Sequence, residues 1–217
     1  QVHIDKKKKQ LRIVDRGIGM THDEVQKYIN DVAFSGAEEF VKQYEGKVEK
    51  GAMIGHFGLG FYSSFMVSSQ VEIKTRSWKS SDDKEGAHWS CDGSPEFELK
   101  GCTKKDRGTE IILHIDIESE DFLEEFKIKE LLKKYARFMS IPIQCGEKEE
   151  RVNVAAEGEE AKYETVKKAD IINETEPAWT KKPSELSGED YNKFYKALYP
   201  YTVEDPLFHI HINVDYP

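Results

Sequence analysis

The run Leu11–Met20 constrains this chain more than any other, because an apolar segment ends there at an acid and a glycine-rich turn follows. The apolar residues of the run favour a β-strand. Asp15 stands where that strand should end, and Gly17 and Gly19 permit a positive φ or a close approach of backbone to a ligand. A carboxylate fixed beside bare backbone can accept a hydrogen bond from an exocyclic amine, such as that of adenine. The run also fits an ordinary polar turn, because short motifs match by accident.

The segments on either side of this run have predictable structure. Val2–Asp5 is strand-like and a lysine-rich turn follows it, which predicts a hairpin with the strand that ends at Asp15. Thr21 and Glu24 have the spacing of a capping box and therefore predict a helix start. Apolar residues continue at helical spacing, and we expect Ser35–Gly36 to end the helix. The glycine turn thus leads directly into a helix N-terminus.

A second glycine-rich run, residues 55–60, precedes the apolar segment 61–67, for which we predict a helix. Backbone N–H groups at such an N-terminus, together with the helix dipole, favour a phosphate group. The chain contains no P-loop lysine pattern, so a phosphate would bind by another design. A glycine turn that lets a helix pack closely explains the run equally well. The polar residues 37–50 between the two glycine runs indicate an excursion that can move.

The order of the later elements indicates the fold class. Residue patterns predict strands at 71–75, 88–91, 97–99 and 108–115, an amphipathic helix over 121–139 and a short strand at 141–143. This order predicts an α+β fold, in which a mostly antiparallel sheet carries helices on one face.

The character of the chain changes after residue 145. Residues 146–176 are dense in charge and poor in core residues, which indicates a linker with weak strands near Val152–Val154 at most. Further on, Ser187 and Asp190 form a cap that predicts a helix, and residues 208–214 alternate as a strand does. We therefore expect a first domain over 1–145, a charged linker over 146–176 and the start of a second α/β domain over 177–217.

Bulk properties exclude some classes of function. The net charge of -9 disfavours nonspecific nucleic-acid binding, which requires a basic surface. Three well-separated cysteines without a C-x-x-C motif, Cys91, Cys102 and Cys145, suggest reduced thiols and a cytosolic setting. The chain has no apolar run of about 20 residues, the length that spans a bilayer, and no signal peptide. It begins on a strand without an initiator Met, which predicts a start inside a domain.

Two short motifs have a structural and a functional interpretation. Asn173–Thr175 matches a glycosylation sequon, although nothing else in the chain suggests secretion. His209 and His211 have the spacing of metal ligands, but no third ligand is evident, which favours a structural role.

Three features taken together are more specific than any one of them: D-x-G-x-G after a strand, a glycine-rich helix start, and Gly108–Thr109 at the opening of a later strand. This combination resembles the nucleotide site of the GHKL ATPases, which include gyrase, MutL, sensor histidine kinases and the ninety-kilodalton heat-shock chaperones. Residues 15–21, 33–36, 54–63 and 179–184 resemble the chaperones most closely, in particular the bacterial HtpG type. The resemblance covers the chain except for the charged linker and implies a Bergerat-type ATPase fold without its N-terminal helix.

The resemblance implies roles for individual residues. Asp15 would accept from the adenine amino group, and Thr109 would complete the hydrogen bonds on that side. The implied nucleotide-binding set is Asp15, Gly17, Gly19, Met20, Ile29, Gly55, Phe57, Gly58, Gly60, Phe61 and Thr109. Residues 34–56 would form a lid over bound ATP. Phe34 and Tyr28 stand where many relatives have Lys and Asn, and neither can make the corresponding charged or amide contact.

The resemblance also implies an activity. ATP, with Mg²⁺ carried by the nucleotide, would close the lid and drive N-terminal dimerisation, so that unfolded client proteins are remodelled and folded in the cytoplasm. Catalytic residues are expected outside this chain, on a helix before Gln1 and in a segment after Pro217. Because phosphoryl transfer depends on positioning and charge stabilisation, the chain by itself should barely hydrolyse ATP.

Two alternatives remain open at this point. The first is another GHKL ATPase, of the histidine kinase or mismatch-repair type. The second is a non-catalytic interaction fragment. For the chaperone we expect no nucleic-acid and no membrane partner.

Overall fold

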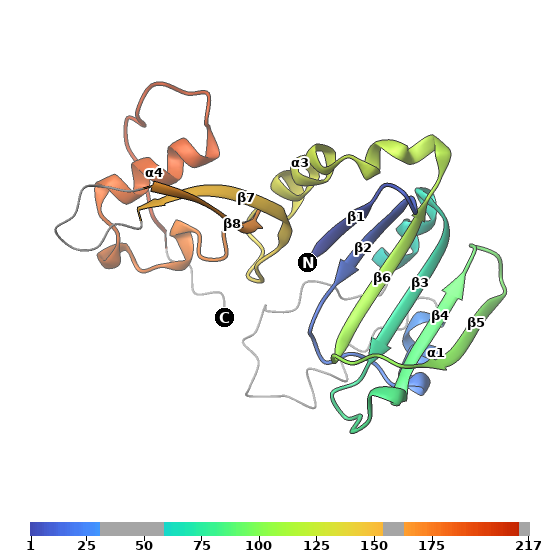
Figure 1. Cartoon of the computed structure of the whole chain (residues 1–217). Coiled ribbons are helices and arrows are strands. Elements are labelled where there is room, and N and C mark those ends of the chain that lie inside the picture. The colour runs from blue at the N-terminus through green and yellow to red at the C-terminus, as the bar shows by residue number, and fades with distance from the viewer. Residues whose placement is uncertain (31–58, 154–162, 213–217) are drawn as a thin grey trace.

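The computed structural model describes residues 1–30, 59–153 and 163–212, which form an α+β fold around one twisted sheet (Figure 1). The strand order in this sheet is β5-β4-β3-β6-β2-β1-β7-β8. The strands are β1 Val2–Asp5, β2 Gln10–Val14, β3 Ser68–Arg76, β4 Gly86–Cys91, β5 Phe97–Cys102, β6 Gly108–Ile115, β7 Gln144–Asn153 and β8 Tyr163–Ile171. Neighbouring strands are antiparallel except β1 and β7, which meet in parallel at Val2 and Cys145. The predicted fold class is confirmed.

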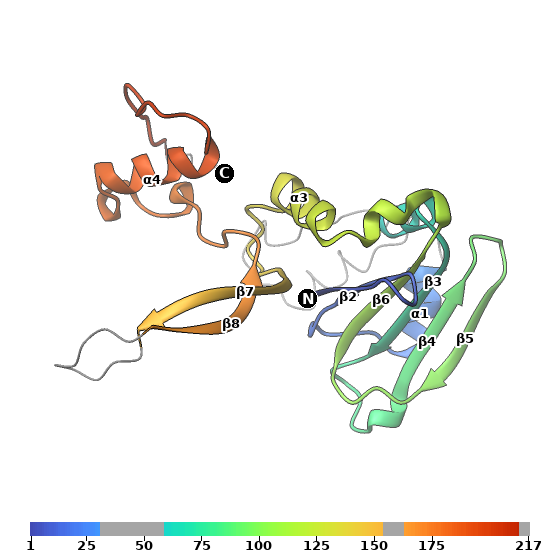
Figure 2. The same cartoon turned by 45° about the horizontal axis from the view of Figure 1, so that its top comes forward.

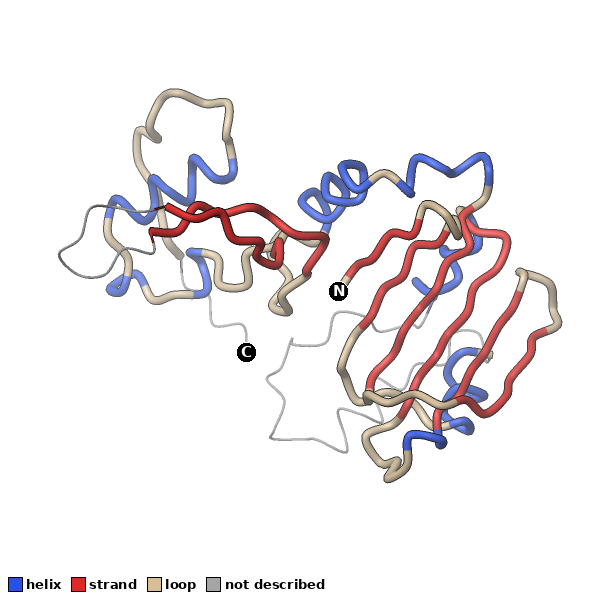
Figure 3. Tube along the Cα trace, in the orientation of Figure 1, coloured by secondary structure: helices blue, strands red, loops and turns tan. Residues whose placement is uncertain are grey.

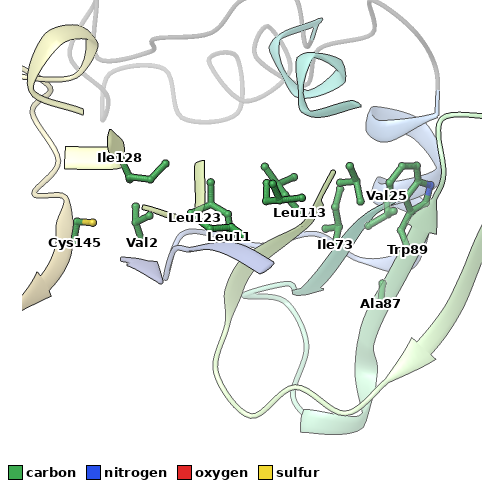
Figure 4. Packing of buried hydrophobic residues seen from close by; sticks show 12 residues of the cluster. Val2, Leu11, Val25, Ile73, Ala87, Trp89, Leu113, Leu123, Ile128 and Cys145 are labelled. Carbon is green, nitrogen blue, oxygen red and sulfur yellow. The ribbon is translucent and has the colours of Figure 1, made fainter. Parts of the chain in front are cut away.

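Helices lie between the strands in the sequence, as the blue and red segments of the trace show (Figure 3). The α-helices are α1 His22–Ile29, α3 Glu125–Tyr135 and α4 Gly188–Leu198. The 3₁₀ helices are η1 Leu59–Met66, η2 Asp83–Glu85, η3 Ile117–Leu123, η4 Ala178–Thr180 and η5 Pro183–Glu185. Helices α1, η1 and α3 lie on the side of the sheet toward which the buried side chains point (Figure 4). None of the helices in the described part of the chain has the length and apolarity needed to cross a membrane.

The core lies between the sheet and these helices. Val71 and Ile73 of β3 are 0% and 1% exposed and pack with Trp89 of β4, Leu113 of β6 and Val25 of α1. Each fully buried aliphatic side chain of this kind contributes about 1.5–3 kcal/mol to stability. Successive side chains of a strand point to opposite faces of the sheet. Thr75 consequently lies on the same face as Val71 and Ile73, toward the helices.

The opposite face of the sheet is polar and is held by hydrogen bonds across strands. The carboxylate of Glu72 on β3 accepts from His88 Nε2 of β4 and from His114 Nε2 of β6, each at 2.7 Å. Arg12 of β2 pairs with Glu110 of β6 on this face. The central strands are therefore joined by side chains as well as by their backbone ladders.

Local sequence signals correctly predicted several elements. The first hairpin pairs Val2 with Ile13, and the Thr21 hydroxyl accepts from Glu24 N while Glu24 accepts from Thr21 N, as a capping box requires. Helix α4 begins after Ser187 with the same reciprocal cap to Asp190. Helix α1 ends at Ile29, where Asn30 is the C-cap. The end expected at Ser35–Gly36 lies outside the described residues.

Two predictions for residues 121–143 are wrong. The helix expected over 121–139 is two helices, because Glu124 is extended (φ -89°, ψ 120°) between η3 and α3. The strand expected at 141–143 does not form, because Ile143 N donates to the side chain of Asn173 at 2.6 Å instead of to a strand partner.

The strand expected at 208–214 is absent from its described part, residues 208–212. Phe208, Ile210 and Ile212 are 76%, 73% and 71% exposed. Alternation alone cannot make a strand without a neighbouring strand to pair with.

The charged region after residue 145 is more regular than a linker. Strands β7 and β8 form a long antiparallel hairpin within it, which extends away from the main sheet (Figure 2). Cross-strand ion pairs such as Lys168–Glu150 use its charges. The domain boundaries near residues 145 and 176 stay predictions.

The sequon asparagine has a structural role. Asn173 is 9% exposed, and its amide nitrogen donates to Met139 O at 2.7 Å and to Ile141 O at 2.8 Å. Its oxygen accepts from Ile143 N, so both amide hydrogens and one lone pair of Asn173 hold the loop after α3.

Candidate functional site

Asp15 is the first residue after β2, and its carboxylate is held by backbone. Asp15 Oδ1 accepts from Gly17 N at 2.7 Å and from Thr109 N at 3.3 Å, while Asp15 N donates to Thr109 O at 2.8 Å. The residue is exposed, and no partner for its Oδ2 occurs among the residues that the structure describes. A fixed carboxylate with one free oxygen is suited to accept a hydrogen bond from a ligand.

The glycines allow the turn after Asp15 to lie directly on neighbouring backbone. Gly19 has φ +62°, and a Cβ there would come within 1.9 Å of Arg76 O at the end of β3. Gly108 has φ +105°, and a Cβ there would lie 2.3 Å from Asp15 O. Both positions require glycine for conformation and for space. The turn is therefore docked on the ends of β3 and β6 with Asp15 at its start.

A buried hydroxyl on β3 connects the two halves of this arrangement. Thr75 is 0% exposed, and its Oγ1 accepts from Met20 N at 2.9 Å. The same oxygen lies 3.2 Å from Gly108 O and 3.1 Å from Thr109 Oγ1. Sequence reasoning missed Thr75. The signal was its place on the inward face of β3, where a polar group must find partners inside the protein.

Three predicted apolar residues of the site lie against the core. Met20, Ile29 and Phe61 all pack against the main core cluster. Tyr62 OH donates to Ile29 O at 2.5 Å, which connects η1 to the end of α1, and the Phe61 and Trp89 rings meet edge to face at 5.6 Å. These contacts place Ile29 and Phe61 on the helix side of the sheet, where the backbone N–H of Met20 bonds Thr75.

The predicted site residues divide into four sets, one of which is the pair Ile29 and Phe61 that packs against the core cluster. Asp15, Gly17, Gly19, Met20 and Thr109 come together around Thr75, as described above. Gly60 is exposed at the start of η1, and a Cβ there would meet nothing within 4 Å. The remaining predicted positions, Gly55, Phe57 and Gly58, the predicted lid over residues 34–56 and Phe34, lie outside the described residues.

A cavity of about 1240 Å³ opens beside Asp15. Its floor is formed by β1, β2 and β6, with Leu11 and Leu113 among the lining residues, and its walls by α3 and η1. Asp15 and Gly17 also line it. A mostly apolar cavity with a few fixed polar groups at one side is typical of a small-molecule site.

Comparison with known families supports this interpretation. Residues 1–109, half of the chain, match the family model described as histidine kinase-, DNA gyrase B-, and HSP90-like ATPase. The chain belongs to this ATPase family. Residues 159–216 match a second model, described as Hsp90 protein.

Curated relatives of this ATPase-family chain include bacterial chaperones. The chain is 50% identical over 216 residues to chaperone protein HtpG of Porphyromonas gingivalis and 51% identical to that of Bacteroides fragilis, and it covers 30% of each relative. It is 38% identical over 217 residues to HtpG of Hydrogenovibrio crunogenus and covers 33% of it. The resemblance to heat-shock chaperones is thus confirmed, and the chain spans about a third of the length of the curated relatives it matches.

The described residues of this ATPase-family chain were compared with the donor sets that hold metal ions. No group of three His, Cys, Asp or Glu side chains suited to a metal ion occurs among them. His209 stacks on the ring of Tyr191 at 3.8 Å, and the Tyr191 hydroxyl lies 2.7 Å from His211 Nδ1. These contacts support the structural interpretation of the His-x-His pair.

Proposed function

We propose that this chain carries the nucleotide pocket of an ATP-dependent molecular chaperone. The observation that carries the proposal is the Asp15 carboxylate, which has Oδ1 fixed by two backbone N–H groups beside a large apolar cavity. Membership of an ATPase family and 50% identity to HtpG chaperones support the same function. The Hsp90 match over residues 159–216 favours the chaperone over the histidine kinase and mismatch-repair types.

In this proposal the polar group at Asp15 recognises the base. Asp15 Oδ2 accepts from the adenine amino group, and Thr109 supplies a second polar contact. Met20, Ile29 and Phe61 pack against the core and do not line the cavity, so their apolar contact with the base is proposed from the resemblance alone. Gly17 and Gly19 hold the turn in place. Gly60 and, beyond the described residues, Gly55, Phe57 and Gly58 would approach the phosphates, with Mg²⁺ carried by the nucleotide. A lid over residues 34–56 stays a prediction from the resemblance.

For the whole protein we propose what the chaperone relatives suggest. ATP binding and hydrolysis would drive conformational change in a cytoplasmic homodimer that acts on unfolded client proteins. Residues 1–217 by themselves would bind nucleotide and hydrolyse it poorly, because the resemblance assigns the catalytic groups to other segments. We expect neither nucleic acid nor membrane as a partner.

Replacing Asp15 by Asn tests the proposal. The amide cannot serve both the backbone N–H groups and a ligand amine as an acceptor, so we expect ADP to bind about 10- to 100-fold more weakly in the full-length protein. Isothermal titration calorimetry measures this affinity.

The chain offers a matched control at the end of β1. Asp5 Oδ1 accepts from Lys7 N at 3.1 Å and from Lys8 N at 3.0 Å, so Asp5 also caps the turn after a strand. Asp5→Asn should leave ADP affinity unchanged. Undiminished ADP binding by Asp15→Asn would show that the assignment of Asp15 is wrong, and a wild-type protein that binds no ADP would favour the non-catalytic interaction fragment.

A further inference from the structure

The hydroxyl of Thr75 has more possible partners than it has hydrogens, which allows its orientation to be worked out. Three polar atoms lie within bonding distance of Thr75 Oγ1: Met20 N at 2.9 Å, Gly108 O at 3.2 Å and Thr109 Oγ1 at 3.1 Å. The side chain is fully buried, so water does not compete for these bonds. A threonine hydroxyl has one hydrogen to donate and two lone pairs to accept with.

Two of the three partners can play only one role in a hydrogen bond with Thr75 Oγ1. Met20 N–H can only donate, so it occupies one lone pair of Thr75 Oγ1. The Gly108 carbonyl oxygen can only accept, and the Thr75 hydroxyl donates to it at 3.2 Å. One lone pair of Thr75 remains for Thr109, and the Thr109 hydroxyl must therefore be the donor in the contact between the two threonines.

This order of donors decides which polar atoms near Asp15 can still donate or accept a hydrogen bond. The hydrogen of Thr109 Oγ1 points to Thr75, so only lone pairs of Thr109 Oγ1 remain for a ligand. The N–H groups of Thr109 and Gly17 both donate to Asp15 Oδ1. A ligand that reaches Asp15 Oδ2 and Thr109 Oγ1 consequently meets two acceptors, one of which is negatively charged.

We propose that Thr75 is a positioning residue for base selection: by holding the Thr109 hydrogen, it makes this wall of the pocket accept hydrogen bonds only. The inference rests on the proposed nucleotide site. An amino group at position 6 of a purine satisfies two acceptors, whereas a keto oxygen at that position faces a carboxylate and a lone pair. Thr75 thus acts through Thr109 and disfavours hypoxanthine and guanine nucleotides without contacting them.

Thr75→Val tests the proposal, because valine keeps the branched shape and removes the hydroxyl. The Thr109 hydroxyl then becomes free to rotate and donate to a keto oxygen. We expect the ratio of ADP to IDP affinity in the full-length protein to fall by about three- to tenfold, which is the worth of one ordinary hydrogen bond. The ratio cancels any general loss of affinity that follows from weaker packing at Met20.

Thr75→Ser is the matched control, because serine restores the hydroxyl and removes only the methyl group. It should return the ADP to IDP ratio to the wild-type value. Arg16, which lines the cavity next to Asp15, is the same in all three proteins and cannot account for a difference between them. A ratio that stays at the wild-type value in Thr75→Val while ADP still binds would overturn the proposal.

Neutron diffraction on the wild-type protein provides a second test that needs no variant. The Thr75 deuteron should lie toward Gly108 O and the Thr109 deuteron toward Thr75 Oγ1. A Thr75 deuteron that points to Thr109 would overturn the inference. If the wild-type protein binds neither ADP nor IDP, the proposed nucleotide site is wrong, and the neutron result still decides the orientation of the hydroxyls.

Discussion

Asp15 and Thr109 are joined by a reciprocal pair of contacts between the end of β2 and the start of β6. Asp15 N donates to Thr109 O at 2.8 Å, and Thr109 N donates to Asp15 Oδ1 at 3.3 Å. The first bond joins two backbone groups and continues the ladder between β2 and β6. In the second bond the side chain of Asp15 serves as the acceptor. The carboxylate is therefore positioned by the sheet itself.

We expect Gly19→Ala to destabilise the protein and to weaken ADP binding. The added Cβ would lie 1.9 Å from Arg76 O, and the positive φ of 62° is strained for alanine, so the turn must leave its place on β3. A loss of at least about 2 kcal/mol should appear in the urea unfolding free energy. Gly101→Ala is the control, because a Cβ there meets nothing within 4 Å. Equal effects of the two substitutions would contradict the close approach described for Gly19.

The Glu72 contacts predict a pH dependence. Burial by itself would raise the pKa of Glu72, but the hydrogen bonds from His114 and His88 and the nearby Lys74 hold the pKa below its ordinary value of 4.5. A carboxyl with a lowered folded-state pKa adds stability above its unfolded pKa, and this stability is lost as the pH falls through the folded-state pKa. The wild-type protein should therefore lose stability as the pH falls below about 4.5.

Glu72→Gln removes this titration. The variant should be less stable than wild type at pH 7, by about 1 kcal/mol or more because hydrogen bonds to a charged group are lost, and its stability should change less with pH between pH 5 and 3. Chemical denaturation at several pH values measures both effects. Glu98→Gln on the exposed face of β5 serves as the control, since its carboxylate forms an exposed ion pair with Lys100. Parallel pH curves for wild type and Glu72→Gln would contradict the role given to the two histidines.

Asn173 predicts a local effect on the loop that follows α3. Removing its amide by Asn173→Ala leaves Ile143 N and the carbonyls of Met139 and Ile141 without these partners, so we expect a loss of about 1–3 kcal/mol. Hydrogen exchange at Ile143 N should accelerate more than exchange in the central strands. Asn192→Ala on α4 is a control of the same residue type. Unchanged exchange at Ile143 would show that the loop is held by other contacts.

Much of the site could be predicted from short stretches of sequence, because the forces involved are local. The capping box at Thr21, the glycines after Asp15 and the alternation of β6 each depend on residues a few positions apart. Thr75 was missed because its hydroxyl is defined by partners 33, 34 and 55 residues away. The strand expected over 208–214 failed within its described part for a related reason, since pairing requires a second strand.

The sequence by itself determined that a strand ends at Asp15, that glycines follow, and that a capped helix begins at His22. These are properties of backbone conformation and of neighbouring side chains. Only the tertiary structure decided that the turn lies on β3 and β6, that Asp15 Oδ1 is shared by two N–H groups and that Thr109 Oγ1 lies 3.1 Å from Thr75 Oγ1. The direction of a hydrogen bond depends on every partner around it, and strand register brings those partners together from distant parts of the chain.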